Sequence, residues 1–211
     1  GGQTLIYTDG ETRGAELPPE LLSQARAALA DDRSATVEKD GEEYFIQAHN
    51  PPLRLFIVGA VHITQALAQI AHLAGYGVTV IDPRRAFADS QRFPNVDVSD
   101  AWPDDFLNSA APDRRTAIVT LSHDPKIDDP ALESVLKSEV FYIGSLGSKR
   151  THGKRLARLH EKGFSEQLTD RIHSPVGLNI GAKSPAEIAI SIMAEITETR
   201  RMGMAGDGGG A

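Results

Sequence analysis

The sequence contains no cysteine, which excludes disulfide bonds, thiolate metal sites and a cysteine nucleophile. It also lacks an apolar run of the roughly 18 residues that a membrane-spanning helix needs, and no secretory signal opens the chain. Positive charge is not in excess, because the net charge is −7 and the pI about 5.5. We therefore expect a cytoplasmic protein with neither nucleic acid nor a membrane as partner. The negative net charge does not exclude a basic loop at one place on the surface.

The 211 residues are 40% hydrophobic and 24% charged, which suits one globular domain with a small annex. Asn50 and two following prolines stiffen a predicted boundary. We expect a small N-terminal α+β segment over 1–50, including a hairpin that turns at Asp40-Gly41. A Rossmann-like domain follows over 51–203, and a flexible glycine-rich tail over 204–211.

From residue 53 onward, strand and helix patterns alternate, which is typical of a doubly wound parallel sheet of the α/β class. The segment 83–112 looks irregular, with Phe93 and Trp102 as expected core anchors. The expected strands cover 53–58, 78–82, 116–122 and 139–143, and the expected helices cover 62–74, 130–137, 149–161 and 185–201.

The turn after the first of these strands resembles a dinucleotide fingerprint with two positions changed. Gly59 follows the strand, but Val61 and Thr64 stand where G-x-G-x-x-G/A has its second glycine and its last small residue. Asp82 lies about 20 residues beyond Gly59, the spacing of an acid that binds a ribose hydroxyl, and an Asp-Pro turn explains it equally well. Arg84 is expected to be solvated, with binding of a phosphate on the ribose as the alternative.

The segment 144–151 is the strongest candidate anion site. Gly144 and Gly147 leave the backbone amides accessible to an anion. Ser148, Lys149 and Arg150 supply further donors at a predicted helix N-terminus. An ordinary strand–helix turn with a basic first turn is the alternative, although cations there oppose the helix dipole.

A second glycine-rich loop precedes the last helix. Ser184 and Glu187 form a predicted capping box, so Ser184 is mainly a cap. Gly181, Ala182 and Lys183, directly before it, are better ligand candidates.

Two histidines and several acids follow strand ends. His62, His123 and Asp124 are candidate ligand contacts. A metal site joining His123 and Asp124 to Asp128 and Asp129 is disfavoured, because Asp129 and the proline after it look like a helix N-cap and first position. We expect no metal site, and we find no nucleophile triad or other catalytic set.

Taken together and in order, five segments resemble the XdhC/CoxI family, and most of all its CoxF-type branch. The resemblance covers about residues 50–200 and is most specific in its last two blocks. The segments are 59–67, 78–84, 120–132, 141–151 and 175–196.

The resemblance implies a Rossmann-like accessory chaperone of molybdenum hydroxylases rather than an enzyme. Such a protein binds molybdenum cofactor (molybdopterin), assists its maturation with a cysteine desulfurase, and delivers it to an apo xanthine or carbon monoxide dehydrogenase. A homodimer is left open. Carried over to this chain, the cofactor-binding residues are Gly59, Ala60, Val61, His62, Asp82, His123, Asp124, Gly144, Gly147, Ser148, Lys149, Arg150, Gly181, Ala182 and Lys183.

This chain departs from longer relatives, whose N-terminal half contains cysteine. Without cysteine it cannot carry sulfur covalently, so a partner must supply the persulfide. An NAD(P)-dependent oxidoreductase and a nucleotide-binding regulatory domain remain as alternatives on the same fold. Val61, Thr64 and the missing hydride-transfer residues weigh against the oxidoreductase.

Overall fold

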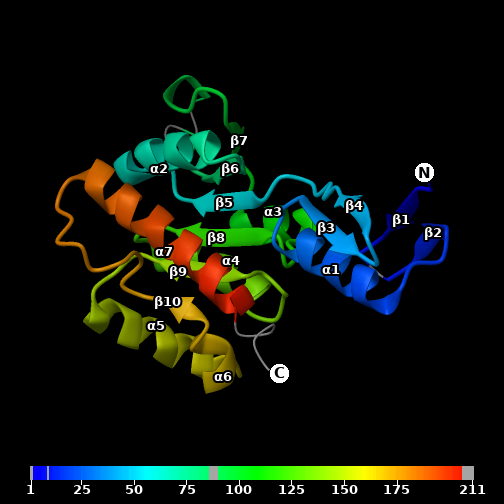
Figure 1. The fold of residues 1–211 in the computed structure, drawn as a ribbon. Coiled ribbons are helices and arrows are strands. Elements are labelled where there is room, and N and C mark those ends of the chain that lie inside the picture. Colours follow the sequence, from blue (N-terminus) through cyan, green and yellow to red (C-terminus); the bar gives the residue numbers. More distant parts are fainter. Residues whose placement is uncertain (1, 9, 86–89, 206–211) are drawn as a thin grey trace. The chain divides into compact units, whose positions relative to one another are not determined.

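The computed structural model describes residues 2–8, 10–85 and 90–205, so the expected tail lies outside the described residues from 206 onward (Figure 1). The chain forms two compact units, the first ending at Pro51 and the second beginning at Pro52. Among the described residues, no helix is both long enough and apolar enough to cross a membrane.

The first unit contains one helix and two antiparallel strand pairs. Asp40 and Gly41 both have positive φ, as the two central residues of a tight hairpin turn require, so the predicted turn is confirmed. The helix turns Leu21 and Ala25 inward. The elements are β1 (Thr4–Ile6), β2 (Thr12–Gly14), α1 (Pro19–Ala30), β3 (Ala35–Lys39) and β4 (Glu42–Ile46).

The second unit is built on a six-stranded parallel sheet in the order β10-β9-β8-β5-β6-β7. The chain moves outward from β5 to β7, then returns to β8 on the other side of β5. The order therefore reverses between β5 and β8, which confirms a doubly wound Rossmann sheet. The strands are β5 (Arg54–Val58), β6 (Gly77–Ile81), β7 (Asp97–Ser99), β8 (Thr116–Thr120), β9 (Tyr142–Ser145) and β10 (Ile172–His173).

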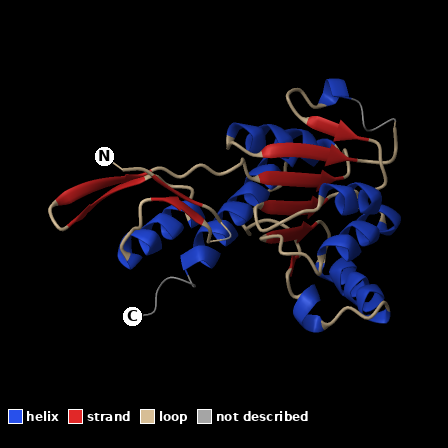
Figure 2. Ribbon diagram, turned by 90° about the vertical axis from the view of Figure 1, so that its right-hand side faces the viewer, coloured by secondary structure: helices blue, strands red, loops and turns tan. Residues whose placement is uncertain are grey.

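Helices cover both faces of this sheet (Figure 2). Because side chains alternate along a strand, Leu55 and Ile57 pack under α2 and α7, whereas Phe56 and Val58 pack under α3, α4 and α5. The helices are α2 (His62–Leu73), α3 (Pro103–Ala110), α4 (Pro125–Val135), α5 (Lys149–Glu161), the short α6 (Glu166–Thr169) and α7 (Pro185–Ala205), and a 3₁₀ turn covers Ser90–Arg92.

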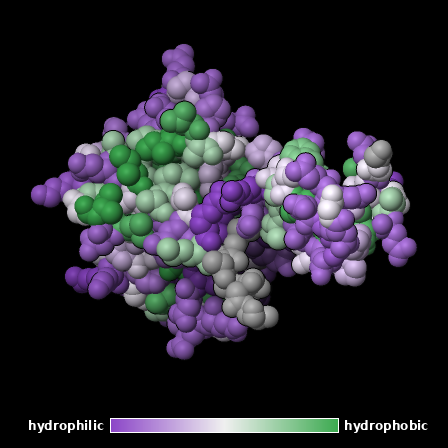
Figure 3. All heavy atoms as spheres, in the orientation of Figure 1, coloured by the Kyte–Doolittle hydropathy of each residue, from purple (hydrophilic) through white to green (hydrophobic). Residues whose placement is uncertain are grey.

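The face formed by α2 and α7 also carries apolar side chains outside the core. Figure 3 shows them gathered over these two helices. Leu73 is 88% exposed and Ile190 is 52% exposed. The apolar surface of α2 and α7 therefore extends beyond the part that packs against the sheet.

Several expectations about local structure are wrong. The segment 83–112 was expected to be irregular but contains β7 and α3. The helix expected at 130–137 begins five residues earlier, at Pro125, because Asp124 is its N-cap, with Oδ1 accepting the Lys126 N–H at 2.9 Å. Pro130 thus lies inside α4, and Asp129 is not a cap. Trp102 is half-exposed at the start of α3, whereas Phe93 is buried as expected.

Gly144 also lies elsewhere than predicted, inside β9 rather than in the following loop. It is paired with Val119 in β8 and with His173 in β10. A Cβ there would come within 2.6 Å of Val176 Cγ2 and within 2.8 Å of the Tyr142 hydroxyl. The position requires glycine because another side chain already fills the space, not because a ligand approaches.

Gly144→Ala is expected to lower the free energy of unfolding by roughly 1–3 kcal/mol, because the methyl group overpacks this site. Gly153→Ala is the matched control, since Gly153 lies inside α5 with nothing within 4 Å of its added Cβ. It is expected to raise stability by about 0.5–1 kcal/mol through helix propensity. Urea unfolding measures both, and equal stability of the two variants would contradict the crowding at Gly144.

Candidate functional site

The carboxyl end of β5 lies unusually close to that of β8. Gly59 has φ +106°, and a Cβ on it would come within 2.7 Å of the backbone nitrogen of Ser122. The Gly59 N–H donates to the Ile81 carbonyl at 2.8 Å, which ties the same turn to β6. Glycine is required here because of its positive φ and this close approach, and three strand ends meet at this point of the sheet.

The two changed fingerprint positions have local structural roles. Val61 is the N-cap residue of α2 and packs against the core on the α2 face. Thr64 is buried, and its hydroxyl donates to the Gly59 carbonyl. The β-branched side chains thus stabilise the turn where a dinucleotide fingerprint has small residues.

Asp82 is fully buried at the end of β6 and accepts four hydrogen bonds. Oδ2 accepts from the Ala60 N–H at 2.8 Å and from Arg84 Nη2 at 2.8 Å. Oδ1 accepts from the Arg84 N–H at 3.0 Å and from its Nε at 2.9 Å. Burial opposes ionisation of Asp82, but these donors outweigh it and lower its pKa. Arg84, expected to be solvated, is instead the ion-pair partner of Asp82.

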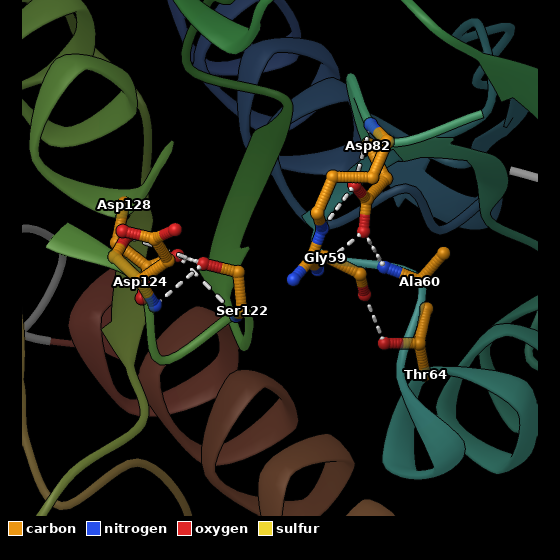
Figure 4. A network of polar contacts seen from close by, with 8 residues as sticks. Gly59, Ala60, Thr64, Asp82, Ser122, Asp124 and Asp128 are labelled. Atoms are coloured by element: carbon orange, nitrogen blue, oxygen red, sulfur yellow. Dashed lines mark hydrogen bonds and ion pairs between the residues drawn. The ribbon is translucent and has the colours of Figure 1, made fainter. Parts of the chain in front are cut away.

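A second buried carboxyl group, that of Asp128 in the first turn of α4, lies beside the end of β8 (Figure 4). The Ser122 hydroxyl donates to Asp128 Oδ1 at 2.6 Å and accepts from the Asp124 N–H at 3.0 Å. Burial raises the pKa of Asp128 to about 6, although the Ser122 hydrogen bond and the charge of Arg155 lower it. This pair holds the turn between β8 and α4.

His123 lies in that turn and is exposed, with φ +63°. A residue other than glycine rarely adopts this conformation, and the bonds of Ser122 on either side hold it there. His62 is exposed at the start of α2. Asp129 points to another partner, Arg158, whose Nη2 donates to it at 3.0 Å. In the described part of the chain, no group of three or more histidines and acids is arranged to hold a metal.

The start of α5 has the predicted form. Ser148 is the N-cap and accepts the Thr151 N–H at 3.2 Å, and Lys149 and Arg150 are exposed in the first turn. Gly147 has φ +148°, and a Cβ there would lie 3.2 Å from the Thr151 side chain. The amide of Leu146, one residue earlier, donates to the Thr120 carbonyl at 2.9 Å and so joins this loop to the end of β8.

Sequence reasoning missed Arg155, which lies beneath this loop. It is 3% exposed, and its Nη2 donates to the Leu146 carbonyl at 3.0 Å. Burial lowers its pKa, against the charges of Asp128 and Asp129. In the sequence it is one basic residue among several in a polar helix, so no local signal distinguishes it.

The loop before α7 is attached to the sheet through Glu195. Its Oε2 accepts from the Gly177 N–H at 2.8 Å and from the Tyr142 hydroxyl at 2.5 Å. His173 Nδ1 lies 3.5 Å from Glu195 Oε1, and the rings of Tyr142 and His173 are 4.7 Å apart. This network was not predicted, because its members are far apart in the sequence.

The predicted capping box of α7 is confirmed. Glu187 Oε2 accepts from the amides of Lys183 and Ser184, each at 2.8 Å, and Ser184 Oγ accepts from the Glu187 N–H at 3.3 Å. The amide of Lys183 is therefore already engaged. Gly181 is exposed with φ +75°, and Ala182 is half-buried.

The predicted site residues thus fall into three groups by exposure. Buried residues shape the strand ends from inside, while exposed and half-buried residues lie in the loops that follow the strands. The buried ones are Gly59, Ala60, Asp82 and Gly144, the half-buried ones are Val61, Asp124, Gly147 and Ala182, and the exposed ones are His62, His123, Ser148, Lys149, Arg150, Gly181 and Lys183.

The family model described as the XdhC Rossmann domain matches residues 55–196. The molybdenum cofactor insertion chaperone PaoD of Escherichia coli is 34% identical over 150 residues, which cover 71% of this chain and 41% of PaoD. A Bacillus subtilis protein named as a probable xanthine dehydrogenase subunit is 34% identical over 158 residues, covering 74% of this chain and 46% of that one. This chain spans less than half the length of each relative.

One solved structure resembles this chain along most of its length. It is the crystal structure of a xanthine dehydrogenase from Bacillus halodurans, with a TM-score of 0.65 and 22% sequence identity, covering 98% of this chain and 77% of the other. At this identity the likeness concerns the fold.

Asp128→Asn is expected to flatten the pH dependence of stability. Because the folded state raises the pKa of Asp128 to about 6, the native protein favours its protonated form. The stability from this group is complete below its ordinary pKa and is lost as the pH rises through about 6, by roughly 1–3 kcal/mol.

Urea unfolding at several values between about pH 4 and pH 7 measures this difference. The matched control is Asp105→Asn, which removes an exposed carboxylate from the first turn of α3. If the parent protein and Asp128→Asn lose stability in parallel as the pH rises, ionisation of Asp128 does not cause the loss.

Proposed function

The chain belongs to the XdhC family, and from that premise we propose that it is a cytoplasmic accessory chaperone that binds molybdenum cofactor. In this proposal it assists maturation of the cofactor and its insertion into a molybdenum hydroxylase of the xanthine or carbon monoxide dehydrogenase type. The name of PaoD as a molybdenum cofactor insertion chaperone supports the proposal, as does the name of the Bacillus subtilis relative. It describes binding and delivery without turnover.

The observation that carries the proposal is the open, basic start of α5 beside the strand ends. Lys149 and Arg150 are exposed, and neither forms an ion pair with a residue that the structure describes. A helix N-terminus favours negative charge, and molybdopterin carries a phosphate. We assign that phosphate to the segment Gly147–Arg150.

The rest of the cofactor would contact the exposed loops of the same edge of the sheet. His62 and His123 follow β5 and β8, and Gly181 to Lys183 precede α7. Gly59, Ala60, Asp82 and Gly144 are buried, so their part in this proposal is to shape the edge rather than to contact cargo.

The partners in this proposal are an apo molybdenum hydroxylase and a cysteine desulfurase. Because the chain has no cysteine, it cannot itself hold a persulfide, and the sulfur must come from the desulfurase. A homodimer that completes the cofactor site is compatible with the proposal.

A nicotinamide-dependent oxidoreductase is the competing function. The four hydrogen bonds that Asp82 accepts within the chain weigh against it, because they leave no acceptor for a ribose hydroxyl. A nucleotide-binding regulatory domain meets the same obstacle.

The double variant Lys149→Ala, Arg150→Ala is expected to weaken molybdenum cofactor binding by about 10-fold or more, because a charge-assisted phosphate contact is lost. Isothermal titration calorimetry under anaerobic conditions measures the affinity. The control Lys154→Ala, Lys162→Ala removes the same charge from exposed positions in the middle of α5 and at its C-cap, and is expected to change affinity little.

Equal affinities of the two double variants would remove the start of α5 from the site. Tight binding of NAD or NADP by the parent protein, without binding of molybdenum cofactor, would contradict the chaperone role itself.

A further inference from the structure

We propose that Arg84 is a specificity-determining residue that, held by Asp82, closes the nucleotide subsite of this Rossmann sheet. The inference concerns which ligands the strand-order reversal between β5 and β8 accepts. It is independent of the cofactor-binding role proposed above, because it depends only on contacts within the chain.

In a dinucleotide-binding Rossmann sheet, two groups near this reversal serve the ligand. The amides of the turn after the first strand approach the pyrophosphate, and the acid at the end of the second strand accepts from a ribose hydroxyl. Here the two groups bind each other, because the Ala60 N–H donates to Asp82 Oδ2 at 2.8 Å. The carboxylate of Asp82 therefore accepts the hydrogen bond of the Ala60 amide, which a phosphate would otherwise accept.

The carboxylate of Asp82 also has no remaining acceptor positions. Two carboxylate oxygens offer about four positions for hydrogen bonds. The Ala60 amide takes one, and Arg84 takes the other three through its backbone amide, Nε and Nη2. Asp82 is 0% exposed, so a ribose hydroxyl can reach it only after Arg84 leaves.

Arg84 extends this closure toward β8. Its pKa is raised first by the hydrogen bonds to Asp82, and the negative charges of Asp124 and Asp128 at the end of β8 contribute to the rise. The guanidinium thus interacts electrostatically with both sides of the strand-order reversal. Figure 4 shows Asp82 on one side and Asp124 and Asp128 on the other, with Gly59 between them.

A pyrophosphate could not simply recruit Arg84. If the guanidinium turned to a ligand, the buried carboxylate of Asp82 would lose its cation, and breaking a buried pair in this way is strongly unfavourable. The same carboxylate would then lie beside the phosphate on the Ala60 amide, so two negative charges would repel each other.

The test is a gain of nucleotide binding. Arg84→Ala removes the guanidinium and so frees two of the four acceptor positions of Asp82. The backbone amide of residue 84 holds a third position, which becomes free only if the backbone shifts. Arg85→Ala is the matched control, because Arg85 is the next residue and pairs with Asp100 at the surface. Calorimetry with NAD and with adenosine, which has the ribose but no phosphate, separates the two parts of the subsite.

We expect the parent protein and Arg85→Ala to bind NAD and adenosine with a Kd above about 1 mM, and Arg84→Ala to bind adenosine at least about 10-fold more tightly. NAD is expected to gain less, because Asp82 still occupies the Ala60 amide and repels the phosphate. Arg84→Gln keeps one donor for Asp82 and serves as a second variant if Arg84→Ala melts near the assay temperature. Thermal unfolding shows which variants are folded.

Two results would overturn the inference. One is adenosine binding by the parent protein as tight as that of the Arg84 variants, and the other is a folded Arg84 variant that binds adenosine no better than Arg85→Ala. Molybdenum cofactor is titrated separately into the parent protein, so a failure of the chaperone role is distinguishable from a failure of this inference.

Discussion

The approach of β5 to β8 at Gly59 is the constraint on which the arrangement of the site depends. A side chain at Gly59 would meet the backbone of Ser122, so the two strand ends can lie this close only with glycine. Their position sets where α2 and α4 begin. It also brings the Asp82 carboxylate and the Ser122–Asp128 pair to neighbouring strand ends of one sheet.

These two buried carboxyl groups show how hydrogen-bond donors and desolvation together set ionisation. Asp82 accepts four hydrogen bonds, three of them from Arg84, and its pKa falls despite burial. Asp128 accepts from Ser122, and burial raises its pKa to about 6. The two pKa shifts are opposite because donors favour the charged form and desolvation opposes it, and Asp128 has fewer donors and the stronger desolvation.

Local patterns predicted much of the second unit correctly. The alternation of strands and helices and the capping box at Ser184 depend on neighbouring residues, as does the hairpin turn at Asp40-Gly41 in the first unit, and all three are present. The start of α4 was wrong because Asp124 and Asp129 each precede a proline and give the same local signal. Packing decided between them, since the earlier start lets Asp128 reach Ser122.

The residue types and their order thus specified a Rossmann sheet, its glycine turns and a basic helix start, since hydrophobic period, turn chemistry and helix caps act over a few residues. Partners distant in sequence were decided only by the tertiary structure. It pairs Asp82 with Ala60, joins Glu195 to Gly177 and buries Arg155 beneath a loop. Such contacts depend on how strands order themselves in the sheet, so no pattern within one segment contains them.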